Sequence, residues 1–459
     1  MSDIQIAIEQ IKAKQSICQM FIDYYNGKHR LAFASEKFDN TFGNTLKGMR
    51  DNLCPIVVDA PADRMEVLNF SGDNTNKAVA DAAWNLWTRE TLELLSNEVH
   101  VEAIKCGYAY LIVWVDENNE AKFYKQDSRQ CVVVEDEGTG EPLFAAKMWL
   151  TADKYTRLTL YYADRIEKYR TARKTEGIGD TLKDKAFIPF TGEGEASTPN
   201  PYGVIPMFEF ETQPVLNDAI PIQDALNKTI CDELIAQEFA AYPQRWATGL
   251  QLPENPITGK QEMPFKAGAD RLWFSNDVGT KFGEFLAAIL EQFIKVEDSR
   301  RLEMARVTGT PLHFFSLNTS DAISGEALKT LESRFTKKVK RLTLNFGTVW
   351  ADAMELALRI EGTAADNITV QWQSPEQRSE KEMWEVGGLK ADLGVPEEII
   401  WEENGYTEED IAKFKKVQAQ QPEPPPGTPP VVDMAGNPVD KNGVPIMRGA
   451  NGTTTAKAA

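Results

Sequence analysis

The chain has few cysteines and histidines for its length. Its 459 residues include five cysteines and three histidines. The cysteines are widely spaced and form no C-x-x-C pair, so neither a disulfide framework nor a zinc site is indicated. His29, His100 and His313 lie far from one another and from every cysteine, which excludes a metalloprotease helix signature. We expect five buried, reduced thiols, no metal, no cofactor and no catalytic site.

Long apolar runs and phosphate-binding loops are missing as well. The longest apolar run, Tyr108 to Val115, is far shorter than the ~20 residues that cross a bilayer, so we expect no membrane span. The first residues lack the basic and apolar regions of a secretory signal, which predicts assembly in the cytoplasm. No G-x-x-x-x-G-K-[ST] loop occurs, so nucleotide hydrolysis lacks its usual phosphate site.

The chain also lacks the excess of basic residues found in proteins that hold DNA over a broad surface. It carries 50 basic and 69 acidic residues, a net charge of −19. Tight binding to DNA requires many cationic contacts with phosphates, so general DNA coating is excluded. About half of this excess of acidic residues lies in Glu376–Asp410, which contains twelve acidic and three basic residues.

What is present is the composition of a globular protein, with 42% hydrophobic and 26% charged residues. The length predicts two to four structural units. Helical spacing of apolar residues predicts helices over Ile4–Tyr24 and Asn76–Leu95, the second with Trp84 and Trp87 in the core. Residues Ile56–Asp59 are predicted to form the first strand.

The next region has strand-length runs separated by turn clusters, which predicts a consecutive antiparallel meander between residues 109 and 168. The first 210 residues or so therefore form an α+β region. Its predicted strands are Tyr110–Val115, Ala121–Tyr124, Cys131–Val134, Leu143–Leu150, Arg157–Tyr162 and, after a loop, Met207–Phe210.

Two long amphipathic helices are predicted further on, at 217–241 and from Phe282 to about 308. Between them the chain breaks into short pieces, of which Arg271–Phe274 is the one clear strand. The two apolar stripes suit packing against neighbouring helices. The stripe residues are Ile222, Leu226, Ile230 and Leu234 in the first helix and Leu286, Ile289, Phe293 and Val296 in the second.

A loop from Leu312 to Ile323 precedes a third helix that begins near Ser324 and continues toward Arg359, roughly 50 Å long. We expect His313, Phe314 and Phe315 to anchor the base of the loop. The third helix carries a basic flank on one side. That flank is either a solvated face or a contact for an acidic neighbour or for DNA, and it consists of Arg334, Lys337 and Arg341.

The C-terminal part is acidic and then rich in proline. A strand is predicted over Ile368–Trp372, followed by acidic helices over Pro375–Leu393 and Pro396–Lys416. From Gln421 to Ala459 the chain has eight of its 24 prolines and no apolar period, which predicts disorder.

The order of these segments, together with short motifs, resembles the portal proteins of long-tailed double-stranded DNA bacteriophages, of the siphophage type. The resemblance covers most of residues 1–417, and the ordered set of segments carries it. The motifs are Tyr24–Gly27, Asn52–Cys54, Thr310-Pro311, Ile323–Lys329 (ISGEALK) and Leu331–Phe335 (LESRF).

The resemblance implies a helix-rich α+β portal fold that assembles into a ring, usually of twelve subunits, around a central channel. By segment, it implies a wing at 1–216, stem helices at 217–241 and 282–308, and a clip at 242–281. It further implies a tunnel loop at 309–323, a long helix joining the wing at 324–365, a crown at 366–417 and a tail at 418–459.

The implied role is structural and not enzymatic: a channel at one capsid vertex through which double-stranded DNA is packaged and ejected. The implied partners are other copies of the chain, the major capsid and scaffolding proteins, the terminase large subunit, a head–tail connector adaptor and the passing DNA. The implied location is the portal vertex of the virion.

The DNA-facing residues implied by the resemblance are uncharged or acidic. A channel that lets DNA slide should make few phosphate contacts, because each neutralised phosphate strengthens binding. The implied residues of the tunnel loop are Asn318, Thr319, Ser320 and Asp321.

Two alternatives stay open at this point. One is a carboxylate-dependent metal nuclease or hydrolase that would use the acidic residues of 366–410. These residues form no compact cluster of mixed ligand types, so a solvated acidic face explains them better. The other is a different virion structural component, such as a scaffold or an adaptor.

Overall fold

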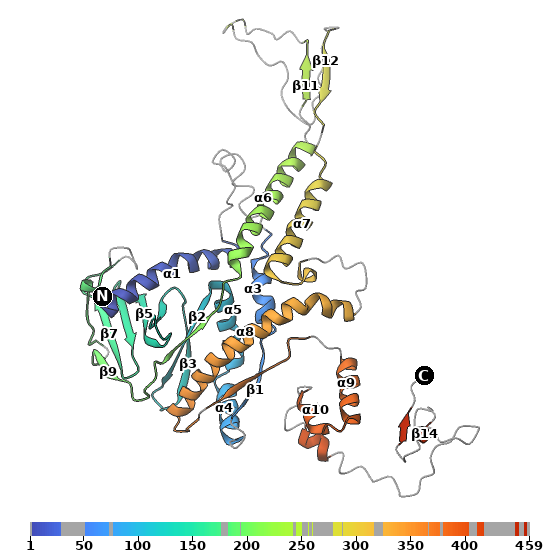
Figure 1. The fold of residues 1–459 in the computed structure, drawn as a ribbon. Coiled ribbons are helices and arrows are strands. Elements are labelled where there is room, and N and C mark those ends of the chain that lie inside the picture. The colour runs from blue at the N-terminus through green and yellow to red at the C-terminus, as the bar shows by residue number, and fades with distance from the viewer. Residues whose placement is uncertain are drawn as a thin grey trace. The chain divides into compact units, whose positions relative to one another are not determined.

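The fold is described from a computed structural model of the full chain. The described residues are 2–28, 51–72, 77–175, 182–192, 194–241, 245–249, 256, 259, 279–286, 288–315, 325–365, 367–376, 380–403, 411–416, 446–448 and 454–456. The chain divides into two compact units, Met1–Gln377 and Arg378–Ala459, and each is described by itself (Figure 1).

The first unit combines long helices with several small sheets. Its helices are α1 (Asp3–Tyr25), α3 (Cys54–Ala62), α4 (Lys77–Arg89), α5 (Leu92–Cys106), α6 (Leu216–Ala241), α7 (Glu291–Thr308) and α8 (Gly325–Ile360), with short 3-10 turns at Asp184–Ala186 and Leu312–Phe314. Its strands are β1 (Val67–Ser71), β2 (Tyr108–Val115), β3 (Ala121–Gln126), β4 (Cys131–Glu135), β5 (Pro142–Leu150), β6 (Thr156–Tyr161), β7 (Arg165–Thr171), β8 (Phe187–Pro189), β9 (Ser197–Pro199), β10 (Met207–Glu211), β11 (Arg245–Thr248), β12 (Lys281–Glu284) and β13 (Thr369–Trp372).

Helix α1 confirms the predicted opening helix. The Ser2 side chain caps it by accepting a hydrogen bond from the backbone N–H of Gln5. Its apolar stripe is divided between two cores: Ile8 and Ile11 pack on the largest sheet, whereas Phe21 packs in the main core of the unit. One amphipathic helix therefore joins the sheet region to the helical region.

The predicted meander is confirmed in its strands and corrected in its pairing. Strands β4 to β8 pair consecutively, with β9 on β7, in a six-stranded sheet. Strands β2 and β3 belong instead to a three-stranded sheet in which β10 pairs with β2. The meander thus breaks between β3 and β4, and the later strand β10 joins β2 and β3 in a separate sheet. That long-range pairing has no local signal in the sequence.

The predicted strand at Ile56–Asp59 is wrong, because these residues lie in helix α3. Pro55 occupies the first turn, where its missing N–H costs nothing. The helix is buried among α1, α5, α6 and α8. A short continuous apolar run is compatible with a buried strand or a buried helix, and here it forms a helix. The Tyr25 hydroxyl donates to the Asp59 carboxylate at 2.8 Å.

The helix predicted over Asn76–Leu95 is two helices. Helix α4 ends at Arg89 and α5 begins at Leu92, because Thr91 adopts a left-handed conformation with φ of 52°. Trp87 is buried and Trp84 packs beside it against the core, as predicted.

Helices α6 and α7 lie side by side and run in opposite directions (Figure 1). Helix α6 matches its prediction, but α7 begins at Glu291 and not at Phe282. Residues Lys281–Glu284 form β12, which pairs antiparallel with β11, so the chain there is extended. Trp246 of β11 lies against the backbone of Gly283, where a Cβ atom would overlap its ring. The predicted strand at Arg271–Phe274 lies outside the described residues.

Helix α8 is the long third helix that the sequence predicts. Its 36 residues span roughly 54 Å. Phe335, Val339, Leu342, Phe346 and Trp350 are buried along one side, in the main core. After the helix, β13 pairs antiparallel with β1, which confirms the predicted strand at Ile368–Trp372.

The centre of this core is a group of aromatic rings around His100. The Trp350 ring lies 5.1 Å from both Trp87 and Phe210, and His100 stacks on Phe346 at 5.4 Å. The Trp350 Nε1–H donates to His100 Nε2 at 2.9 Å. His100 is fully buried, and burial lowers its pKa to about 3, so the imidazole is neutral at pH 7.

The second unit contains short helices and a strand pair. Helices α9 (Glu380–Asp392) and α10 (Glu397–Glu403) fall within the predicted acidic helices, and residues 411–416 are helical. Strands β14 (Ile446–Arg448) and β15 (Thr454–Ala456) pair antiparallel, so the prediction of disorder is wrong for these residues. The remaining residues of the tail lie outside the described part.

All five cysteines are buried and free, as predicted. Within the described residues, no helix has the length and apolarity needed to cross a membrane. The same residues hold no group of three or more His, Cys, Asp or Glu side chains suited to a metal ion.

Candidate functional site

The basic flank of α8 faces the C-terminal end of α7. The Arg334 guanidinium donates to the Arg306 carbonyl at 2.9 Å, and the Lys338 ammonium donates to the Thr308 carbonyl at 3.0 Å. The last carbonyls of a helix have no partner inside it and carry partial negative charge, so cations placed there stabilise the helix end. Two cations of this region therefore hold α7 on α8.

Lys338 is the buried member of the group. Burial, together with the nearby charges of Arg341 and Arg334, lowers its pKa to about 8, and Asp218 opposes this shift. Lys338 is not one of the three residues of the predicted flank, although it follows Lys337 directly. The fixed end of α7 is what buries it, and no spacing within α8 could show that contact.

Lys337 and Arg341 remain exposed beside these two cations. Together the four line a cavity of about 640 Å³, whose other lining residues come from α7, the turn after it and residues 213–218. Asp218 is the one acidic residue among the lining residues. The basic side of α8 therefore has two roles. Arg334 and Lys338 bind the C-terminal end of α7, whereas Lys337 and Arg341 line the cavity with positive charge.

The base of the predicted tunnel loop is packed as expected. Phe315 is buried, and the Phe314 ring lies 6.1 Å from the ring of Phe335 in α8. His313 Nε2 lies 3.2 Å from an oxygen of the buried Glu332 carboxylate, which also faces Arg64. The four residues expected to face DNA lie outside the described residues, and they are Asn318, Thr319, Ser320 and Asp321.

The first predicted stripe divides along α6. Ile222 and Leu226 are buried in the core of their own chain. Ile230 and Leu234 are half-buried further along the helix. Ile222 and Leu226 pack within their own chain, where α6 contacts α3, and the assignment of the stripe to subunit packing stays a prediction.

The second predicted stripe is largely exposed. Phe293 is half-buried and Val296 exposed on α7, whereas Leu286 and Ile289 precede the helix, so their expected place on it is wrong. Leu286 is 100% exposed and Ile289 63%. Three further exposed apolar residues of α7 are not part of the predicted stripe, although their apolar character in a charged helix is a signal in the sequence. They are Ile294, Leu302 and Val307.

The contact between α6 and α7 includes two carboxyl groups. Burial and the neighbouring Glu233 of α6 raise the pKa of Glu297 in α7, while Arg301 lowers it. Arg301 also contacts the Asp51 carboxylate at 3.0 Å. These contacts tie the inner half of α7 to α6 and to the segment before α3.

A family model described as "Phage portal protein, SPP1 Gp6-like" matches residues 5–423, nine-tenths of the chain. The chain therefore belongs to this family of phage portal proteins, which confirms the resemblance stated from the sequence. The family is structural and not enzymatic.

Two relatives named portal protein come from mycobacteriophages. The chain is 25% identical over 334 residues to the protein of Mycobacterium phage D29, covering 66% of this chain and 64% of the relative. It is 28% identical over 186 residues to the protein of Mycobacterium phage L5, covering 37% of this chain and 38% of the relative.

The chain also matches a solved structure, described as "Neck of empty GTA particle computed with C6 symmetry". The identity is 13% and the TM-score 0.46, over 78% of this chain and 93% of that one.

Proposed function

We propose that the chain forms a closed ring, usually of twelve subunits, that serves as the portal of a phage capsid. Double-stranded DNA would enter and leave through its channel, and the ring would sit at one vertex of the virion. Membership of the portal family supports this function. The chain itself would carry out no chemical step, and it would assemble in the host cytoplasm.

The main observation that supports assembly into a ring is the exposed apolar surface of α7 and of the segment before it. Ile294 is 52% exposed and Leu302 54%, and the neighbouring Phe285, Leu286 and Ile289 are also exposed. An apolar surface of this length on a monomer marks an interface. In a cyclic ring each subunit contacts its neighbours through two different surfaces, so such a patch is covered when the ring closes.

The regional assignment follows the order of the elements. We propose a wing formed by residues 1–216, stem helices α6 and α7, and a clip over 242–281 that includes β11. The tunnel loop would span 309–323, α8 would join it to the wing within 324–365, and 366–417 would form the crown, followed by the tail 418–459.

The proposed partners follow from the same regions. The clip would dock the terminase large subunit during packaging and a head–tail connector adaptor afterwards, and the ring would contact the major capsid and scaffolding proteins during assembly. Of the basic flank, Lys337 and Arg341 would meet DNA or a neighbouring subunit, because Arg334 already holds α7.

The ring is tested by adding charge to the exposed surface of α7. We expect the double substitution Ile294→Glu and Leu302→Glu to abolish closed rings, because buried unpaired carboxylates would oppose the contact. Mass photometry of the purified protein, mixed with its scaffolding protein, measures the assembly. The matched control, Gln292→Glu with Ser299→Glu, adds two carboxylates to the same helix at polar positions and should leave rings intact. Monomers alone from the unchanged protein would contradict the proposal.

A further inference from the structure

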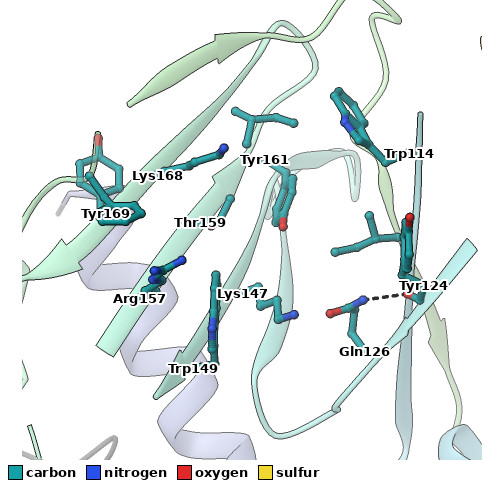
Figure 2. A pocket seen from close by; sticks show the side chains of 13 residues that line it. Trp114, Tyr124, Gln126, Lys147, Trp149, Arg157, Thr159, Tyr161, Lys168 and Tyr169 are labelled. Atoms are coloured by element: carbon teal, nitrogen blue, oxygen red, sulfur yellow. Dashed lines mark hydrogen bonds between the residues drawn. The ribbon is translucent and has the colours of Figure 1, made fainter. Parts of the chain in front are cut away.

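A second cavity lies between the two larger sheets of the first unit (Figure 2). Its volume is about 340 Å³. One wall comes from β2 and β3 through Ile112, Trp114, Tyr124 and Gln126, and the other from β5, β6 and β7. Tyr124 is 49% exposed, so this side of the cavity meets solvent. Three of the lining residues, Ile112, Trp114 and Tyr161, also belong to or pack on a small core between the two sheets.

The strand register explains which side chains face this cavity. Lys147 of β5 pairs with Thr159 of β6, which pairs with Lys168 of β7. In the next row Trp149 pairs with Arg157. Side chains alternate between the faces of a sheet, so these residues share one face. The residues between them, such as Met148 and Leu158, pack against α1 on the opposite face.

The lining combines cations with aromatic rings. Lys147, Arg157 and Lys168 supply positive charge, and none of the 13 lining residues is acidic. The Lys147 ammonium lies 4.9 Å from the centre of the Trp149 ring, and the Arg157 guanidinium lies 4.4 Å from that of Phe190. This is a concentration of positive charge in a chain whose net charge is −19.

The carboxylate next to Lys168 in β7 is bonded to other residues of the strand. Glu167 follows Ile166 in β7, and its carboxylate accepts hydrogen bonds from Arg165 at 2.7 Å and from the Tyr169 hydroxyl at 2.9 Å. The positive charge of the cavity is therefore not neutralised by the adjacent acid of the same strand. An ordinary solvated sheet face presents polar side chains to water. It would not place tryptophan and lysine side chains together around a cavity, as this face does.

We propose that this cavity docks an acidic peptide segment of a partner protein, with carboxylates bound by Lys147 and Lys168 and apolar side chains seated among the aromatic rings. Lys147 and Lys168 are two strands apart, about 9.5 Å at the backbone. Alternate side chains of an extended peptide point the same way and are about 6.6 Å apart, so long lysine side chains can reach two carboxylates of one peptide.

Single-stranded nucleic acid is the competing occupant, because aromatic rings and cations also bind stacked bases and phosphates. Two observations favour the peptide. The cavity is short, about 340 Å³, and the net charge of −19 on the chain opposes a polyanion that extends beyond it. An acidic peptide needs only a local positive site.

The test uses the full chain and three labelled probes in fluorescence anisotropy. The first is an eight-residue peptide of alternating aspartate and leucine, the second replaces aspartate by serine, and the third is an eight-nucleotide oligothymidine. We expect saturable binding of the acidic peptide, and at least tenfold weaker binding of the serine peptide and of the oligothymidine.

Two variants decide the site. Lys147→Glu with Lys168→Glu should weaken binding of the acidic peptide at least tenfold. The matched control Lys174→Glu, at an exposed lysine outside the lining, should change it less than twofold. Equal effects of the two variants, absence of saturable binding to the unchanged protein, or tighter binding of oligothymidine would each overturn the proposal.

A measurement on the unchanged protein guards against misfolding of the double variant. Hydrogen exchange in β5, β6 and β7 should slow when the acidic peptide is added and should not respond to the serine peptide. Protection confined to other elements would show that the peptide binds elsewhere, and it would overturn the assignment of the cavity.

Discussion

The region around His100 and the outer face of helix α7 use the same kind of sequence in opposite ways. In both, apolar residues recur at helical spacing. Around His100, the stripe of α8 meets α5, β10 and β13 of its own chain and is fully buried. Along α7, no such layer among the described residues covers Ile294, Val296 and Leu302, which stay exposed. Periodicity thus identifies a face that must be covered, but it does not identify the chain that covers it.

The sharpest test of this comparison uses two residues of one helix. Met304 is fully buried at the inner end of α7, whereas Leu302 is 54% exposed. We expect Met304→Ala to lower the free energy of unfolding of the isolated subunit by about 2–5 kcal/mol, because it leaves a cavity in the core. Leu302→Ala should change it by less than about 0.5 kcal/mol.

Urea unfolding followed by circular dichroism measures both variants under conditions that keep the subunit monomeric. If Leu302→Ala were as costly as Met304→Ala, the outer face of α7 would already be packed within one chain. The contrast between the two regions would then fail.

The next effect concerns the pH dependence of the buried region. The pKa of His100 is about 3 in the folded chain and about 6.5 when unfolded, so the unfolded chain binds the proton more tightly. The contribution of neutral His100 to the free energy of unfolding is fully present above pH 6.5 and is lost as the pH falls from there toward 3. Lowering the pH from 7 to 5 should cost about 2 kcal/mol of unfolding free energy through this residue.

The variant His100→Gln removes the pH-dependent contribution of His100, because glutamine can accept the Trp350 hydrogen bond without titrating. The difference between unchanged protein and variant should shrink or reverse between pH 7 and pH 5, measured by urea unfolding at each pH. Parallel pH profiles for the two proteins would show that His100 is not held neutral by its core.

The smallest expected effect separates the two kinds of cation on α8. Arg334→Ala removes a donor to the end of α7 and should cost about 1 kcal/mol. Lys337→Ala, three positions along at an exposed site, should stay within about 0.5 kcal/mol. Differential scanning calorimetry of the two variants makes the comparison. Equal losses would mean that the flank acts as one structural patch.

Local sequence determined much of the secondary structure. The capped start of α1, the long stripe of α8 and the turn-separated strands from β2 to β6 all follow from spacing and turn chemistry within a few residues. The loop base at Phe314 and Phe315 was likewise predictable, because large aromatic residues beside a helix usually pack. Membership of the portal family was recognisable from the order of segments.

Tertiary structure decided what each face touches. The short apolar run at Ile56–Asp59 lies in a helix that packs against four other helices, and β2 and β3 form a separate sheet with the distant strand β10. Tertiary structure also brings together residues that are far apart in the sequence. Arg334 and Lys338 contact the end of α7. Lys147 and Lys168 lie on either side of Thr159 in the six-stranded sheet. Spacing fixes which side chains share a face, whereas the partner of that face depends on long-range packing that the local pattern does not encode.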